Sequence, residues 1–296
     1  MLQLLLGGSG SGKTTLLYQR IRARAEKGEK SILLVPEQFT SSTEGRIYRE
    51  LGDALSGMVE SFSFTSLAEK ILSTEGGAAV QTLSDAGRAV LVRRALEELQ
   101  DNVHYYHRHR RSAAFCQMAA QTIDELKSAG LSGRQLAQLA GACGAESGKL
   151  SELALIFQGY ETLLARSGMD PSDRLELAGA RLEEALARHS LPEFLRDRAV
   201  FIDEFDTFNA PKKRLLGAML AALPCVTVAL CDDGAPLLPG DVSLFSGAKQ
   251  VAVQLRQLAR KNGAEVAAPE LLRRDLRHAA APGLAAVTEL LETGVC

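Results

Sequence analysis

Residues 2–14 read Leu-Gln-Leu-Leu-Leu-Gly-Gly-Ser-Gly-Ser-Gly-Lys-Thr, an apolar run followed at once by a glycine-rich turn. The turn fits the phosphate-loop pattern, in which a glycine and four further residues precede Gly-Lys-Thr. The apolar run is typical of a short buried strand, and Leu16, Leu17 and Ile21 follow the turn at helical spacing. The stretch therefore predicts a strand, an anion-binding loop and a helix in succession.

The residue types of this loop suit a nucleoside triphosphate. Glycines let backbone N–H groups approach dense negative charge closely, and the start of a helix adds free N–H groups and partial positive charge. Lys13 is expected to reach the β- and γ-phosphates, and the Thr14 hydroxyl to ligate Mg²⁺. The residues predicted to bind ATP are Gly7, Gly8, Ser9, Gly10, Ser11, Gly12, Lys13, Thr14 and Thr15.

The composition bounds the class of protein. A chain of 296 residues should form about two domains, and 46% hydrophobic residues are typical of a soluble globular protein. With a net charge of −2 the chain as a whole is not positively charged, so any nucleic-acid contact must come from local basic patches. Five scattered cysteines without a Cys-x-x-Cys pair favour a reducing cytoplasm over disulfides or zinc. We expect no membrane span and, with the first strand so early, no cleavable signal peptide.

Strand and helix patterns alternate at both ends of the chain. Apolar runs predict strands at 31–35, 59–64, 199–202 and 226–230, and a short final strand at 264–267. Between them, residues 67–189 are rich in Ala, Leu, Arg and Glu, with apolar residues at helical spacing. We therefore predict an α/β fold in which residues 1–66 and 195–270 form a sheet domain, 67–194 an inserted all-helical subdomain and 271–296 a connection.

The strand at 199–202 is followed by Asp203 and Glu204. A buried strand that carries an acid out at its carboxyl end, beside a phosphate loop, is typical of phosphate-loop ATPases. Asp203 would then hold Mg²⁺ through water, and Glu204, the candidate catalytic residue, would polarise the attacking water. The alternative is an ordinary strand that ends in two exposed acids.

Two further loops follow strands on the edge of the sheet where ligands bind in α/β folds. Their candidate contact residues are Gln38, Phe39, Thr40, Ser63, Phe64, Thr65 and Ser66. The alternative is turn and cap chemistry, with Thr65 or Ser66 capping a helix that begins at Leu67.

The densest basic and aromatic cluster is His-Tyr-Tyr-His-Arg-His-Arg-Arg at 104–111. Arginines there suit phosphates and tyrosines suit stacking on bases, but a solvated segment between helices is the favoured interpretation. Metal binding by its three histidines is disfavoured because no carboxylate or cysteine lies among them.

Several segments together resemble one family. The phosphate loop and the segments at 35–40, 63–68 and 201–208 occur in the order seen in superfamily 1 helicase-like proteins. Val-Pro-Glu-Gln-Phe-Thr at 35–40 and Asp-Glu-Phe-Asp-Thr-Phe at 203–208 specifically resemble AddB, the B component of the bacterial AddAB helicase–nuclease. The resemblance extends over essentially the whole chain.

The resemblance implies a RecA-like domain 1A with an inserted helical subdomain 1B. It also implies ATP and Mg²⁺ as cofactors, an AddA-like motor subunit as partner, and double-strand break processing for recombination. Single-stranded DNA would lie across the loops at 38–40 and 63–66. AddB proteins are several times longer, so this chain would be their N-terminal part. Residues 271–296 would lead toward a second lobe, and an iron–sulfur cluster would belong to a nuclease domain beyond it.

The chain departs from active superfamily 1 helicases at three points. No adenine-contacting glutamine motif precedes the first strand, Thr65 replaces a usual histidine, and the stretch at 231–235 lacks the coupling glutamine. We therefore expect ATP binding with weak or absent hydrolysis. The alternatives are a self-sufficient phosphate-loop ATPase or kinase, with a helical lid that carries Arg108, Arg110 and Arg111, and a scaffold without catalytic use.

Overall fold

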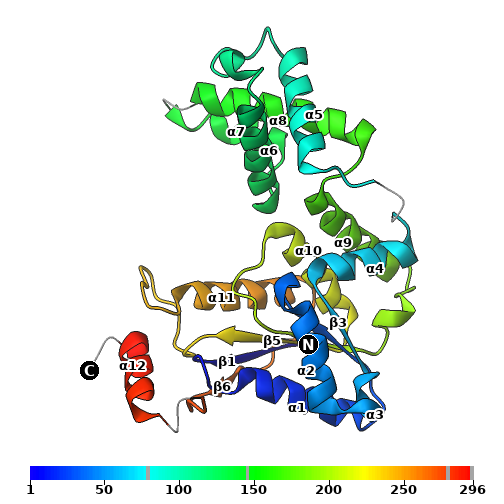
Figure 1. The fold of residues 1–296 in the computed structure, drawn as a ribbon, viewed down its shortest axis with the longest axis vertical. Coiled ribbons are helices and arrows are strands. Elements are labelled where there is room, and N and C mark those ends of the chain that lie inside the picture. Colours follow the sequence, from blue (N-terminus) through cyan, green and yellow to red (C-terminus); the bar gives the residue numbers. More distant parts are fainter. Residues whose placement is uncertain (78–80, 145–146, 278–280, 294–296) are drawn as a thin grey trace. The chain divides into compact units, whose positions relative to one another are not determined.

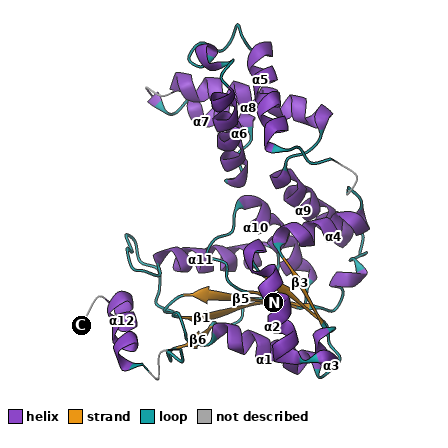
Figure 2. Ribbon diagram, viewed as in Figure 1, coloured by secondary structure: helices purple, strands orange, loops and turns teal. Residues whose placement is uncertain are grey.

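The computed structural model describes residues 1–77, 81–144, 147–277 and 281–293. It contains a six-stranded sheet in the order β3-β2-β4-β5-β1-β6, and every pairing in it is parallel. Figure 2 shows the strands in orange among the purple helices. The strands are β1 (Leu2–Gly7), β2 (Ser31–Leu34), β3 (Val59–Phe62), β4 (Ala199–Ile202), β5 (Cys225–Cys231) and β6 (Glu270–Leu272). The predicted α/β class with a parallel sheet is confirmed.

The chain separates into two compact units. Unit 1 comprises Met1–Glu75, Gly179–Phe208 and Lys213–Cys296, and unit 2 comprises Gly76–Ala178 and Asn209–Lys212. The helices and 3₁₀ turns before residue 77 are α1 (Lys13–Ala25), η1 (Glu37–Phe39), α2 (Thr40–Leu51), α3 (Asp53–Ser56) and α4 (Phe64–Glu75). Those that follow the return to the sheet are η4 (Glu193–Leu195), α10 (Ala210–Ala222), α11 (Ser246–Lys261) and α12 (Pro282–Thr293).

The sheet of unit 1 is covered on both faces. In Figure 1, α1 and α11 lie on opposite sides of the strands. Every residue of β2 and β4 is buried, and all of β1 except Gln3. Such near-continuous apolar runs are what a parallel sheet between two helical layers requires, and they explain why the strands were predictable from sequence.

Unit 2 is helical. Its elements are α5 (Asp85–Glu98), η2 (His107–His109), α6 (Ala113–Ser128), α7 (Gly133–Ala140) and α8 (Ser147–Ser167), and α9 (Pro171–Ala187) passes from this unit into unit 1. The core is centred on Phe157 and Tyr160 of α8, which are almost fully buried against apolar residues of α5 and α6. One polar network enters this core and joins Tyr160 to Lys127 and Asp170.

The structure corrects the predicted carboxyl end of the sheet. The final strand is 270–272, paired with residues 5–7 of β1, whereas the predicted stretch at 264–267 makes only an isolated bridge from Val266 to Leu2. The predicted boundary at residue 270 therefore cuts through β6. The alanines in Ala264–Ala267 have weak strand preference, whereas Leu271 and Leu272 pair along the edge that β1 leaves open.

The start of α4 also differs from the expectation. The helix begins at Phe64 rather than Leu67. The Ser66 N–H donates to Ser63 Oγ at 3.1 Å, and the Ser63 N–H donates to Ser66 Oγ at 2.9 Å. Ser63 therefore caps the helix, because it supplies the acceptor for a first-turn N–H that would otherwise have no partner.

Candidate functional site at the carboxyl edge of the sheet

The glycine-rich loop joins β1 to α1. Gly10 and Gly12 have φ values of +76° and +91°, a region that disfavours side chains. A Cβ on Gly10 would also lie 2.7 Å from Asp275 Oδ1 and 2.8 Å from Arg277 Cβ. These glycines are therefore required both by the backbone conformation and by a chain segment packed against the loop.

Lys13 folds back over this loop. Its ammonium group donates to the carbonyl oxygens of Gly7 and Gly8, at 2.7 Å each. Backbone carbonyls are weaker partners for a cation than a charged phosphate, so a bound phosphate would compete for Lys13 within the same loop.

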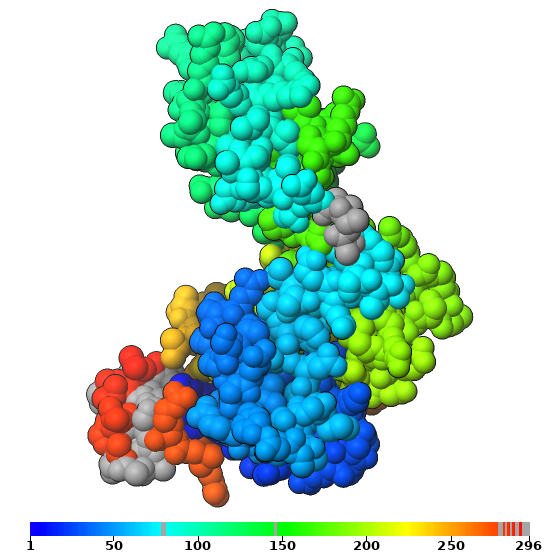
Figure 3. All heavy atoms as spheres, turned by 45° about the vertical axis from the view of Figure 1, so that its right-hand side comes forward, coloured from blue at the N-terminus to red at the C-terminus, as the bar shows by residue number. Residues whose placement is uncertain are grey.

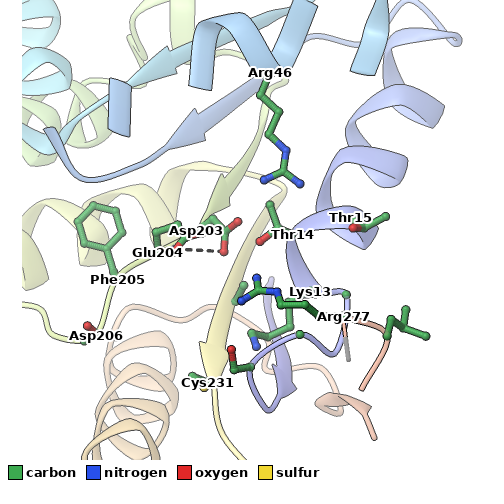
Figure 4. A pocket seen from close by; sticks show the side chains of 15 residues that line it. Lys13, Thr14, Thr15, Arg46, Asp203, Glu204, Phe205, Asp206, Cys231 and Arg277 are labelled. Carbon is green, nitrogen blue, oxygen red and sulfur yellow. Dashed lines mark hydrogen bonds between the residues drawn. The ribbon is translucent and has the colours of Figure 1, made fainter. Parts of the chain in front are cut away.

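Asp203 and Glu204 leave the sheet at the end of β4. Although β5 lies between β4 and β1 in the sheet, Asp203 and Thr14 line the same two hollows, and the Thr14 side chain is close enough to favour the ionised form of Asp203. The Asp203 carboxylate accepts the Glu204 N–H at 3.0 Å (Figure 4). The acid from the distant strand and the hydroxyl after the glycine-rich loop thus meet, as a shared metal site requires.

The pKa values of both acids are raised. Burial raises the pKa of Asp203 above its ordinary value, against the opposing effects of the Thr14 side chain, the Glu204 N–H and Lys13. Burial, and then the charge of Asp203, raise the pKa of Glu204. Glu204 also has a φ of +63°, unusual for a residue other than glycine, and such strained positions concentrate at functional sites.

Replacing Asp203 with asparagine is expected to stabilise the ligand-free chain. Because the folded-state pKa is raised, the ionised carboxylate destabilises the fold at neutral pH, and this cost disappears as pH falls through the raised pKa. Asparagine carries no charge and keeps an acceptor for the Glu204 N–H. Scanning calorimetry should show a higher melting temperature, with a gain that shrinks on acidification. A gain that does not depend on pH would contradict this explanation.

A cavity of about 500 Å³ contains these groups. Its lining includes two cations that sequence reasoning missed, Arg46 from α2 and Arg277 from the segment after β6. Figure 4 shows the Arg46 guanidinium pointing from α2 toward Thr14 and Asp203, and Arg277 reaching alongside Lys13. With Lys13, the cavity brings three cations around the acids and would suit a polyanion bound together with a metal ion.

The segment after β6 is held against the glycine-rich loop. The N–H groups of Leu276 and Arg277 donate to the Gly10 carbonyl oxygen, at 3.0 and 3.3 Å. Glu270 of β6 also pairs with Arg20 of α1. In the space-filling view, orange residues near 270 lie directly against blue residues of the N-terminal part (Figure 3). Leu276 and Arg277 of this segment are therefore part of the site.

Of the candidate contact residues at 38–40, Phe39 lies close to the acids. Gln38 is exposed, Phe39 is 38% exposed, and the Thr40 hydroxyl donates to the Glu37 carbonyl oxygen at 3.0 Å. Phe39 lines a second hollow together with Thr14, Arg46 and Asp203. The structure thus brings this loop, through α2 and Arg46, next to the cavity at the glycine-rich loop.

The candidates at 63–66 are placed differently from one another. Thr65 and Ser66 are exposed, and Ser63 is buried in the cap of α4. Phe64 is only 2% exposed, with its ring edge-on to Phe205 and Phe208 at centroid distances of 5.2 and 6.0 Å. The prediction that Phe64 faces a ligand is therefore wrong for this structure, because its ring fills the core beside the end of β4.

Together, the six-stranded parallel sheet and its helices are those of an α/β protein and agree with a RecA-like fold. The chain belongs to a known family: the family model described as "ADDB, N-terminal" matches residues 4–288.

Curated relatives support this assignment. The B subunit of the ATP-dependent helicase/deoxyribonuclease of Desulforudis audaxviator is 34% identical and aligns with 96% of this chain. Proteins of the same name from Moorella thermoacetica and Symbiobacterium thermophilum are 33% and 31% identical, over 90% and 98% of the chain. The chain spans about a quarter of the length of these relatives: the alignments cover 25%, 24% and 26% of them, respectively. Among the described residues, every helix is too short or too polar to cross a membrane.

Proposed function

We propose that this chain is the helicase-like N-terminal part of the B component of a helicase–nuclease, which binds ATP and Mg²⁺. The observation that carries the proposal is the meeting of Lys13, Thr14 and Asp203 in one cavity. The family membership supports the same assignment, because the relatives are named ATP-dependent.

Each residue of the site has a role in this proposal. Backbone N–H groups of 8–15 surround the phosphates, and Lys13 exchanges the carbonyl oxygens of Gly7 and Gly8 for phosphate oxygens. Thr14 and Asp203 would hold Mg²⁺, which neutralises charge on the β- and γ-phosphates. No group of three His, Cys, Asp or Glu side chains suited to a metal occurs among the residues that the structure describes. Phosphate and water oxygens would complete the metal's coordination. Arg46 and Arg277 add positive charge on two further sides.

The assembly and process form the wider part of the proposal. The chain would act with an AddA-like motor subunit in the cytoplasm and lay single-stranded DNA across the loops at 38–40 and 63–66 during double-strand break repair by recombination. The exposure of Gln38, Phe39 and Thr65 supports such a contact. The nuclease activity and its iron–sulfur cluster would belong to other parts of the full-length protein, because this chain spans about a quarter of its relatives.

Replacing Glu204 with glutamine is expected to change ATP turnover by less than about twofold, because turnover itself should be close to background. The stretch at 231–235 has no glutamine to couple hydrolysis to DNA. The test is a phosphate-release assay on the full chain, beside a calorimetric titration with Mg·ATP. Saturable binding with negligible turnover supports the proposal. Robust turnover that the substitution abolishes would favour a self-sufficient ATPase instead.

A further inference from the structure

Unit 2 carries an aromatic hollow of about 430 Å³ that the proposed function does not use. Its lining includes Tyr105, Tyr106, His109, Phe115, Met118 and Lys149. The rings of Tyr106 and Phe115 are stacked, with centroids 5.4 Å apart and planes 29° apart. His109 lies against the same Phe115 ring at 5.5 Å and 32°. The hollow therefore contains a short run of rings with similar planes.

Two large side chains of this hollow are open to solvent. Tyr105 is 58% exposed and Met118 is 55% exposed. A tyrosine ring presented in this way offers a flat face on which another ring can stack.

A buried carboxylate holds this surface in place. Glu152 of α8 is only 6% exposed. It accepts the N–H groups of His104, Tyr105 and Tyr106, at 2.7, 2.8 and 3.3 Å. Burying a carboxylate is costly unless hydrogen bonds compensate, and here the compensation comes from the backbone that presents the two tyrosines. The loop is thus pre-organised and would lose little conformational entropy on binding.

The segment that carries the rings of the hollow is basic. Residues 102–123 contain Arg108, Arg110 and Arg111 and no acidic residue. Arg108 and Arg111 are exposed, and Lys149 lines the hollow itself. An occupant that complements this surface carries negative charge and flat apolar faces.

We propose that this surface, the aromatic hollow with Arg108 and Arg111, binds single-stranded nucleic acid. A base would stack on the exposed ring of Tyr105, and phosphates would lie against Arg108, Arg111 and Lys149. Aromatic platforms with adjacent cations bind unpaired strands in this way with little sequence preference. A peptide fits less well, because the hollow is lined mainly by aromatic side chains and the loop offers no strand edge. The inference rests on the proposed function only in taking DNA as the ligand, and the surface lies wholly in unit 2.

The test is fluorescence anisotropy of the full chain with a labelled oligothymidylate. Replacing Tyr105 with alanine should weaken binding about tenfold, the lower part of the range for loss of one stacking ring. Replacing Arg108 with alanine should lower the dependence of log affinity on log salt by roughly 0.7 for one phosphate contact. The matched control is Tyr48→Ala, which removes a tyrosine of similar exposure (54%) from α2 in unit 1 and should leave affinity unchanged.

Photocrosslinking with bromodeoxyuridine in the same oligonucleotide locates the contact. Crosslinks within 104–118 together with the Tyr105 effect support the inference. Full affinity in Tyr105→Ala, with crosslinks only near 38–40 or 63–66, would overturn it while leaving the proposed function intact. Loss of assembly with the motor subunit in Tyr105→Ala, at unchanged DNA affinity, would instead identify a protein interface. Absence of oligonucleotide binding by the wild-type chain would refute both this inference and the DNA contact of the proposed function.

Discussion

Replacing Lys13 with alanine should weaken Mg·ATP binding by about 10- to 150-fold, because a charge-assisted phosphate contact contributes about 1.5–3 kcal/mol. Lys13 follows the two glycines with positive φ, donates to the carbonyl oxygens of Gly7 and Gly8, and lines the cavity. Isothermal titration calorimetry measures the affinity, and a thermal melt checks the fold.

The matched control for this change is Lys27→Ala. Lys27 lies just beyond the end of α1 and is exposed, so its loss removes the same charge from the far end of that helix, outside the cavity. It should bind Mg·ATP as the wild type does. If Lys13→Ala kept the wild-type affinity, the glycine-rich loop would not be the nucleotide site, and the role of Asp203 would lose its basis as well.

Replacing Asp170 with alanine should destabilise the helical unit by about 3 kcal/mol, the lower end of the range for breaking a buried ion pair. Asp170 is 1% exposed. It accepts the Tyr160 hydroxyl at 2.5 Å and the Lys127 ammonium at 2.7 Å. Its loss would leave the buried Tyr160 hydroxyl without this acceptor, while Lys127 would keep Asp173 at 2.8 Å. Hydrogen exchange of the α6 and α8 amides would localise the effect to this unit.

Two further variants separate the contributions. Tyr160→Phe removes only the hydroxyl and should cost about 1 kcal/mol. Glu97→Ala breaks an exposed pair with Arg93 and should cost less than about 0.5 kcal/mol. Equal effects of all three changes would show that burial does not control the strength of this network.

The same network should make stability depend on pH. Burial lowers the pKa of Lys127, but its hydrogen bonds to Asp170 and Asp173 outweigh burial and raise that pKa above its ordinary value. Burial first, and then Asp170, raise the pKa of Tyr160. A group whose folded pKa is raised stabilises the fold below its unfolded value and stops doing so as pH rises through the folded value. The stabilisation that Asp170 supplies should therefore persist at neutral pH and decline in strong alkali.

Sequence reasoning predicted the elements whose signals are local. The predicted strands β1 to β5 and the helix after the glycine-rich loop are confirmed. Apolar runs such as Leu2–Leu6 and Val200–Ile202 are typical of strands that are buried on both faces of a parallel sheet, and the run itself is visible in the sequence. The glycine-rich turn at 7–12 was predictable for a similar reason, because the backbone conformations that require glycine are set within a few residues. The acids at 203–204 could be placed at a strand end for the same reason.

Other features of the site depend on packing between distant segments. Arg46 and Arg277 enter the cavity because α2 and β6 are positioned by the sheet, and no local pattern marks either residue. Phe64 was a candidate contact residue because it follows a strand at the ligand-binding edge of the sheet, but its ring packs against Phe205 and Phe208 and is part of the core. The hollow around Tyr105 depends on Glu152, which lies 47 residues further along the chain.

The sequence by itself determined the strand–loop–helix unit at the amino end, the parallel sheet and the strand that ends at Asp203, since apolar periodicity and glycine conformation act over a few residues. Only the tertiary structure decided that β5 lies between the strand of the glycine-rich loop and the strand of Asp203, that β6 packs against that loop, and that the Tyr105 ring stays open to solvent. Those outcomes depend on which segments are buried against one another, and burial is a property of the whole packed chain.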